Sequence, residues 1–397
     1  MFFRQYKNKP NRPLTVHHGI FRPEMSLFEG IALMTSGTIG AGVLGIPFVV
    51  AQVGMQVGLV YILVLGLLMM GLNLMLGEVS SKTGETFQLV GLARKYLGRV
   101  GALCMTVIVY AVLFGVLVVY IIGEGETLAN LFGGSAFNWS ILFFAVASAF
   151  VIAGMHTIKI IELVLTAGIF AVVILIAGLS SPHVAMENVL YTDLAHIFLP
   201  YGVILFAFHG TTAIPEMHSV LQKKDKIFQK AIIVGGALVI LVYVLFALSV
   251  VGVTGQETTE IATIGLGQKL GPTMFVFGNV FAFFAMATSF LLTGVALRDS
   301  LMWDYKMKHV LSVAITLLVP LFIFLLGLRA FIVALDIVGG VFGSIEMLLI
   351  LFIYWQAKRK GDLKIGKFKL HHTALLGALL LIVFLIGAVY SVGKLLG

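Results

Sequence analysis

Charged residues are scarce in this chain of 397 residues, because only 11% are Asp, Glu, Lys or Arg whereas 60% are hydrophobic. A water-soluble domain carries about 25% charged residues to cover its surface, so the composition excludes that class. The chain has one cysteine, Cys104, which excludes an intrachain disulfide. It also lacks the short alternating segments of a transmembrane β-barrel. The first 25 residues are polar and basic and lack the apolar core of a signal peptide. An all-α polytopic membrane protein is predicted.

Long apolar stretches are abundant, and eleven of them could each supply the roughly 20 helical residues that cross a bilayer core. They lie near residues 28–54, 56–78, 100–122, 138–155, 158–179, 196–217, 230–252, 272–297, 309–327, 330–355 and 373–393. With the N-terminus in the cytoplasm, 23 Lys and Arg fall on the cytoplasmic side and 3 on the other. This asymmetry follows the positive-inside rule and favours eleven transmembrane helices in that orientation. It also explains the net charge of +8 without nucleic acid.

Two of the expected connections have structure of their own. Residues 85–97 mix apolar with basic side chains and predict a short interfacial helix on the cytoplasmic face, with a plain loop as the alternative. Residues 254–271, on the outer side, are either a lid over a vestibule or a long loop.

Two of the expected spans contain residues that break helices. The first reads SGTIGAGVLGIP over 36–47, and the second reads FAFHGTTAIPE over 206–216. Backbone that leaves a helix inside a bilayer must be buried in protein or line a wet cavity. Glycine-rich helix packing is the alternative for either break alone. Together, at corresponding places in two halves of the chain, the breaks indicate a transporter binding site.

The breaks also organise the chain. Spans 1 and 6 are five apart, so they cross the membrane in opposite directions and can open two repeats of inverted topology. The prediction is a five-plus-five inverted repeat with broken helices 1 and 6 and an extra helix 11. Its parts are a cytoplasmic tail over 1–25, a first repeat over 26–179, a second over 196–355, and the extra helix with the C-terminus over 371–397.

The chemistry of the breaks favours a zwitterionic ligand. N–H groups at the start of a half-helix suit a carboxylate, and freed carbonyls at the end of another suit an ammonium group. An α-amino acid is the simplest molecule with both groups. The predicted substrate-binding residues are Thr38, Gly40, Ala41 and Gly42 in the first break, and Phe206, Phe208, His209 and Gly210 in the second.

Three segments resemble a known family. Residues 37–47, 206–210 and 287–291 (continuing to Asp299) resemble the helix 1, 6 and 8 motifs of the amino acid/auxin permease group and of the tyrosine- and tryptophan-type permeases. These groups belong to the amino acid-polyamine-organocation superfamily. The resemblance implies a LeuT-type fold and amino acid transport driven by a sodium or proton gradient. Residues 211–216 also match the broader amino acid/auxin permease group, so the resemblance does not specify which amino acid is transported.

The resemblance implies one candidate ion site and the sequence offers another. In sodium-coupled members, oxygens at the positions of Ala285, Thr288 and Ser289 combine with carbonyls at the positions of Ser36 and Ile39. The alternative is that the hydroxyls bond back to their own helix. Proton coupling instead needs a titratable group at membrane depth, and His209 and Glu346 are the candidates.

Other functional classes are less well supported by the sequence. An intramembrane enzyme would need a nucleophile and base or a metal cluster, and the His and Glu spacings fit neither. A ligand-sensing receptor on the same fold is the alternative to a transporter. The prediction is a multi-pass protein of the cytoplasmic (inner) membrane that imports an amino acid, with lipid as its surroundings, no nucleic acid partner, and no cofactor beyond the coupling ion.

Overall fold

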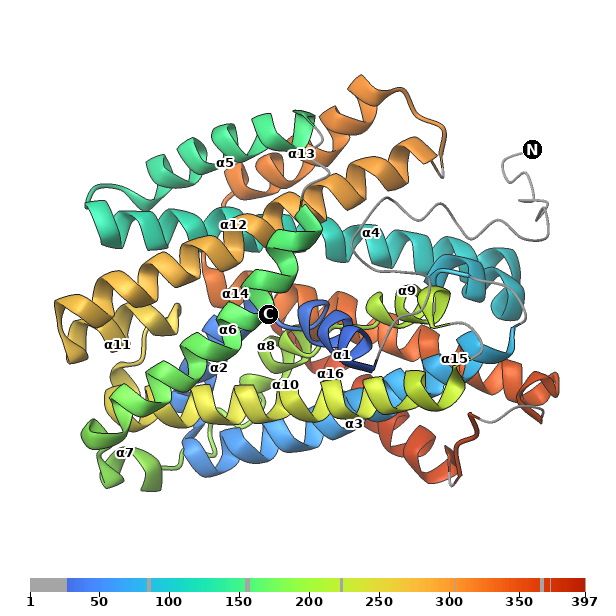
Figure 1. The fold of residues 1–397 in the computed structure, drawn as a ribbon, viewed down its shortest axis with the longest axis horizontal. Helices are drawn as coiled ribbons and strands as arrows, with labels where there is room; N and C mark the ends of the chain where they lie inside the picture. Colours follow the sequence, from blue (N-terminus) through green and yellow to red (C-terminus); the bar gives the residue numbers. More distant parts are fainter. Residues whose placement is uncertain are drawn as a thin grey trace.

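The computed structural model of the chain describes residues 27–83, 87–153, 158–221, 224–303, 305–364, 368–371 and 373–396. In these ranges the chain is helical and contains no strand (Figure 1). Seven helical segments are long and apolar enough to cross a membrane. They are α3 (Met55–Lys82), α4 (Leu89–Phe132), α5 (Ala136–Ala153), α10 (Asp225–Thr254), α12 (Pro272–Trp303), α16 (Thr373–Leu396), and the continuous run of α14 (Phe331–Asp336), η3 (Ile337–Gly343) and α15 (Ser344–Arg359).

The remaining expected spans coincide with shorter or interrupted helices. The first is α1 (Leu27–Ser36) followed by α2 (Gly42–Val53), and the sixth is α8 (Pro200–Ala207) followed by α9 (Ala213–Val220). The fifth and ninth match α6 (Ile158–Ser180) and α13 (His309–Leu325). The all-helical membrane class and both breaks are therefore present. The count of eleven spans and the domain boundaries stay predictions, and the tail over 1–25 lies outside the described residues.

The helices form two groups (Figure 1). One consists of α4, α5, α12 and α13, which pack on one another. The other consists of α1, α2, α3, α8, α9 and α10. The continuous run of α14, η3 and α15 lies between them, since η3 contacts both α4 and α8, and α15 contacts both α4 and α3. The two broken spans therefore lie in the same group.

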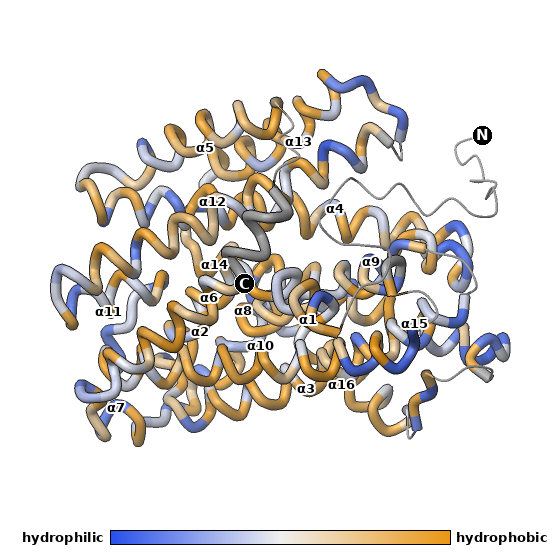
Figure 2. Tube along the Cα trace, in the orientation of Figure 1, coloured by the Kyte–Doolittle hydropathy of each residue, from blue (hydrophilic) through white to orange (hydrophobic). Residues whose placement is uncertain are grey.

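The hydropathy of the residues varies along the long axis of the helix bundle. Figure 2 shows hydrophobic residues over most of the length of the helices and hydrophilic residues gathered towards their ends. Large apolar side chains are exposed on the outside, including Leu103 of α4 at 65% and Leu67 of α3 at 54%. Apolar patches of this kind mark a surface that faces a partner or lipid. Because the exposed side chains lie on membrane-length helices, lipid is their natural environment.

The two structured connections are also visible. Gly98, with φ of 75°, breaks the helical geometry of α4, so residues 89–97 form a separate helical segment, as expected for 85–97. Residues 85 and 86 lie outside the described residues. The segment 254–271 contains η2 (Gly255–Glu257) and α11 (Ala262–Leu270), and α11 packs on α12 and α10. It is a folded connection.

Three further short elements are η1 (Ser181–His183), α7 (Met186–Leu190) and η4 (Asp362–Lys364).

The η3 segment is a π-helix, and no pattern in the sequence indicates one there. A π-turn has one more residue than an α-turn and is often found at functional sites. Gly339 faces the backbone of Gly202 and Phe206, so a side chain at 339 would collide with α8. Gly340 of η3 faces Ser391 of α16, and Asp336, the last residue of α14, pairs with Lys394 of α16 at 2.8 Å. The segment thus holds α8 and α16 together.

Candidate functional site

The first break joins α1 to α2 through residues 37–41. The Thr38 hydroxyl donates to the Met34 carbonyl at 2.8 Å and satisfies an acceptor in the last turn of α1. Where α2 starts, the backbone hydrogen bonds of the described residues leave the N–H groups of Gly40, Ala41 and Gly42 unused. Such N–H groups carry the positive end of the helix dipole and can bind an anion.

The second break joins α8 to α9 through residues 208–212. It begins with a tight turn, in which the N–H of His209 donates a hydrogen bond to the Phe206 carbonyl at 3.0 Å. The Ala207 carbonyl accepts a hydrogen bond from the Tyr243 hydroxyl of α10 at 2.7 Å. One of the carbonyls expected to be free for an ammonium group is therefore already paired with the protein.

The two breaks pack directly against each other. A Cβ atom on Gly42 would lie 2.6 Å from the Cα of Ala207, and a Cβ on Gly37 would lie 2.7 Å from the Cβ of Ala213. Gly210 faces Thr38 so closely that a side chain there would collide with the Thr38 hydroxyl. Because real Cβ contacts are longer than these distances, glycine is required at the crossing. The two breaks, which contain the predicted substrate-binding residues, therefore lie side by side.

The two candidate proton-binding residues also meet at this site. His209 Nε2 lies 3.0 Å from Glu346 Oε2, in an ion-pair contact between the second break and α15. The Thr211 hydroxyl donates to Glu346 Oε1 at 2.7 Å and lies 3.4 Å from His209 Nε2. Glu346 is only 1% exposed. A buried carboxylate at membrane depth thus has a titratable partner 137 positions away in the sequence.

Sequence reasoning missed two tyrosines of the site. Tyr243 is fully buried, and its hydroxyl lies between the Ala207 carbonyl at 2.7 Å and the Thr38 carbonyl at 3.4 Å, so it joins the two breaks. The hydroxyl of Tyr120 in α4 faces Gly40, at 3.3 Å from where a Cβ would stand, and lies beside Ser289 of α12. The only available signal was an isolated hydroxyl within each apolar run.

The aromatic residues of the second break are part of the protein core. Phe206 and Phe208 are 8% and 4% exposed. The Phe208 ring lies 4.9 Å from the Tyr243 ring, centroid to centroid. Phe206 packs against Gly42 and Gly339. Both side chains lie at the crossing of the breaks. They could contact a ligand only if the ligand bound inside this packed region.

Two hydroxyls of the implied sodium site, those of Thr288 and Ser36, are engaged within their own helices. The Thr288 hydroxyl donates to the Phe284 carbonyl at 2.7 Å, with the Ala285 carbonyl at 3.3 Å. The Ser36 hydroxyl donates to Leu33 at 3.3 Å. In the described part of the chain, no hydrogen bond joins Ser36 or Ile39 to α12. Ser289 instead faces Tyr120.

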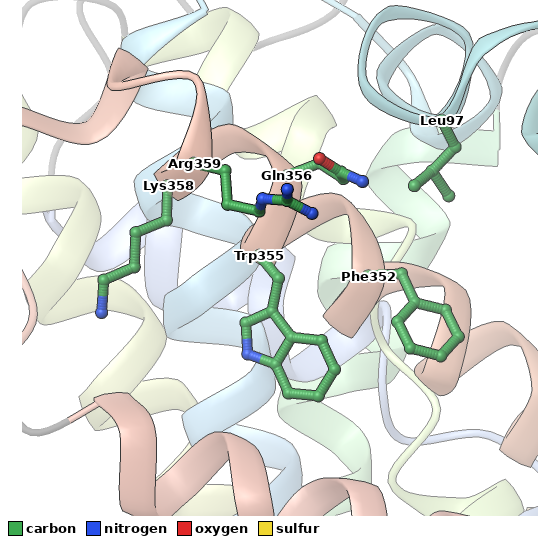
Figure 3. A pocket seen from close by; sticks show the side chains of 6 residues that line it. All are labelled: Leu97, Phe352, Trp355, Gln356, Lys358 and Arg359. Carbon is green, nitrogen blue, oxygen red and sulfur yellow. The ribbon is translucent and has the colours of Figure 1, made fainter.

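A separate pocket lies at one end of the bundle and is shown in Figure 3. It has a volume of about 760 Å³ and is lined by Leu97 from α4 and by Phe352, Trp355, Gln356, Lys358 and Arg359 from α15. None of these residues belongs to the breaks. The site built around the breaks is therefore distinct from this pocket.

Known proteins resemble this chain over most of its length. The chain is 28% identical over 367 residues to "Tyrosine-specific transport system 1" of Haemophilus influenzae, covering 84% of this chain and 89% of that protein. It is 26% identical over 379 residues to "Glutamine transporter 2" of Aliivibrio fischeri, covering 89% and 98%. These relatives are transporters, in agreement with the expectation that the chain is not an enzyme.

A solved structure shares the fold. Mhp1, a nucleobase-cation-symport-1 family transporter, in a closed conformation with bromovinylhydantoin bound, superimposes with a TM-score of 0.62 at 13% identity, covering 92% of this chain and 90% of that one. The model of the tryptophan/tyrosine permease family matches residues 23–392. This match spans nearly the whole chain and includes both breaks, so the protein belongs to the tryptophan/tyrosine permease family.

Proposed function

We propose that the protein imports an amino acid across the cytoplasmic membrane by alternating access, driven by a proton gradient. The relatives are named for tyrosine and glutamine transport, so tyrosine, tryptophan and glutamine are the first substrates to test. The observation that carries the proposal is the contact between His209 and Glu346 at the crossing of the two breaks.

The ligand chemistry supports an amino acid. The unused N–H groups of Gly40, Ala41 and Gly42 suit its carboxylate. The carbonyls that gather around Tyr243, from Thr38 and Ala207, are acceptors for its ammonium group once the tyrosine hydroxyl moves aside. A zwitterion would thus bridge the two broken helices and favour one relative position of the two.

The titratable pair explains how a proton gradient could drive the cycle. Burying two charges costs several kcal/mol each unless they neutralise one another. Protonation of Glu346 leaves His209 either neutral or as an uncompensated buried cation, so the charge at the break depends on the bound proton. The break can then close readily in one protonation state and poorly in the other. The Thr288 hydroxyl, which bonds to its own helix, gives the sodium alternative less support.

The grouping of the helices supports the inverted repeat. In the group of α1, α2, α3, α8, α9 and α10, the first and second expected spans lie with the sixth and seventh. In the group of α4, α5, α12 and α13, the third and fourth lie with the eighth and ninth. Each member has a counterpart five spans later in its own group. Two such groups rocking against each other is the motion that transporters with inverted repeats use.

The test is uptake of radiolabelled tyrosine, tryptophan and glutamine by purified protein in liposomes. With the outside acidic and sodium replaced by choline, we expect accumulation above equilibrium. Glu346→Gln should abolish accumulation but retain exchange of internal for external substrate, which needs no gradient. The exposed Glu187→Gln is the matched control and should behave as the wild type.

Two results would overturn the proposal. Accumulation that requires sodium would exclude proton coupling through the pair. Substrate binding without any exchange would favour the receptor alternative.

A further inference from the structure

Glu124 in α4 is an acidic residue that the proposed mechanism leaves without a role. Its side chain is 0% exposed, and within the described part of the chain neither carboxyl oxygen has a hydrogen-bond partner. The Ala287 backbone of α12 faces the carboxyl without forming a hydrogen bond of normal geometry. An unpaired carboxylate in such surroundings would cost several kcal/mol, so the group is either neutral or needs a cation.

The position of Glu124 connects it to the site. Residues four apart share a face of a helix, so Glu124 lies one turn from Tyr120, whose hydroxyl faces Gly40 of the first break. The neighbouring Gly123 packs against Met286 and Phe331, so apolar side chains lie against this part of α4. Along α4, Glu124 lies between the breaks and the end of the bundle opposite the basic connections, which the topology assigns to the outside.

Other charged groups in this region have different surroundings. Glu126 lies two residues further along α4, about 200° around the helix, and interacts with Glu260 of the outer connection. The Glu260 carboxylate accepts a hydrogen bond from the Ile332 N–H at 3.1 Å. Arg329 lies over the Phe137 ring, 4.7 Å from its centroid, and forms no ion pair in the described ranges. None of these groups supplies Glu124 with a cation.

We propose that Glu124 is a second proton-binding site, which takes up a proton from the outer side each time the outer half of the bundle closes. The inference rests on the proposed import by alternating access, which requires the path from the outside to the breaks to open to water. In the open state the hydrated carboxyl releases its proton to water and ionises. Closing removes the water, so the carboxylate must first bind a proton from the outside and become a neutral acid.

Proton binding at Glu124 has a different effect on transport from proton binding at the His209–Glu346 pair. The proton on Glu124 is taken from and returned to the same side, so it controls how readily the outer half closes and does not drive accumulation. Exchange of substrate, which requires repeated closing, should slow as the outer pH rises, by at most about tenfold per pH unit for a single proton. Accumulation driven by the gradient should persist without the Glu124 carboxyl.

The test is exchange by the reconstituted protein with the inner pH fixed and the outer pH varied from about 5 to about 8, a range in which buried carboxyls titrate. Wild-type exchange should fall as the outer pH rises. Glu124→Gln, which mimics the neutral acid in size, should lose the part of this fall that Glu124 causes, so it should exchange faster than the wild type at high outer pH. Glu126→Gln is the matched control and should keep the wild-type profile.

The outcomes separate this proposal from the proposed function. A wild type without accumulation under a proton gradient would contradict the proposed coupling, whereas exchange at symmetrical substrate concentrations still reports on Glu124. The inference is overturned if Glu124→Gln keeps the wild-type pH profile, if Glu126→Gln loses it instead, or if folded Glu124→Gln no longer binds substrate, since that would indicate a charged partner for the ammonium group.

A second measurement does not depend on transport. The infrared spectrum of the detergent-solubilised wild type at neutral pH should contain a carbonyl band of a neutral carboxylic acid that is missing from the spectrum of Glu124→Gln. Identical spectra in this region would show that Glu124 is ionised, and would overturn the proposal even if the variant were inactive.

Discussion

The crossing of the two breaks can be tested by adding one methyl group. In Gly42→Ala, the new Cβ would stand 2.6 Å from the Cα and 2.7 Å from the Cβ of Ala207, and 3.0 Å from Cδ1 of Phe206. Carbon atoms pack best at about 3.5–4.0 Å, so the helices must separate by about 1 Å. The nearest atoms belong to backbone and to a short side chain, so neither can rotate away.

Overpacking of this kind costs about 1–3 kcal/mol. If the closed crossing is the state that binds substrate, the same free energy lowers the apparent affinity by about 5- to 150-fold. The measurements are the midpoint of thermal unfolding in detergent and the concentration dependence of uptake in liposomes. Both should shift, because the crossing contributes to the stability of the fold and to the shape of the site.

Gly178→Ala is the control. Gly178 is exposed on α6 and a Cβ there meets no atom within 4 Å, so this variant should unfold at or slightly above the wild-type midpoint. If Gly42→Ala matched Gly178→Ala in both measurements, the direct packing of α2 on α8 would be refuted as the basis of the site.

Three further substitutions give distinct expected results. Tyr243→Phe removes the donor to the Ala207 carbonyl and should lower the free energy of unfolding by about 1–3 kcal/mol, measured by thermal denaturation, because a buried acceptor loses its partner. Thr288→Ala should leave uptake unchanged in sodium and in choline media, because the hydroxyl bonds to its own helix; a selective loss in sodium would contradict the proton proposal. Lys394→Met should lower the free energy of unfolding by about 1 kcal/mol or less, measured by thermal denaturation, because the Lys394 end of its pair with Asp336 is 41% exposed and screened by water.

The sequence was sufficient to locate both breaks, because Gly and Pro inside long apolar runs have few structural explanations. It also identified His209 and Glu346 as titratable groups at membrane depth. Their contact could not be predicted, since it depends on how α15 lies against the second break and no local pattern encodes that arrangement.

Other features lacked a distinctive local signal. Tyr243 is one tyrosine in an apolar run, and tyrosines in such runs are common near membrane surfaces. Glu124 could be mistaken for a residue at the end of a span, because the expected span ended near 122 whereas α4 continues to Phe132. The π-helical geometry of η3 depends on close packing against α8, which the pair Gly339-Gly340 permits but does not by itself specify.

The π-helical segment links the winding of one helix to proton binding. Glu346 is the third residue after the end of η3, so its angular position around the helix axis depends on how many residues η3 fits into each turn. If a π-turn in η3 became an α-turn, α15 would rotate by about 100° about its axis. The Glu346 carboxyl would then move out of reach of His209. A shift of one residue in η3 would therefore be enough to join or separate the acid and its base through rotation of α15 about its own axis.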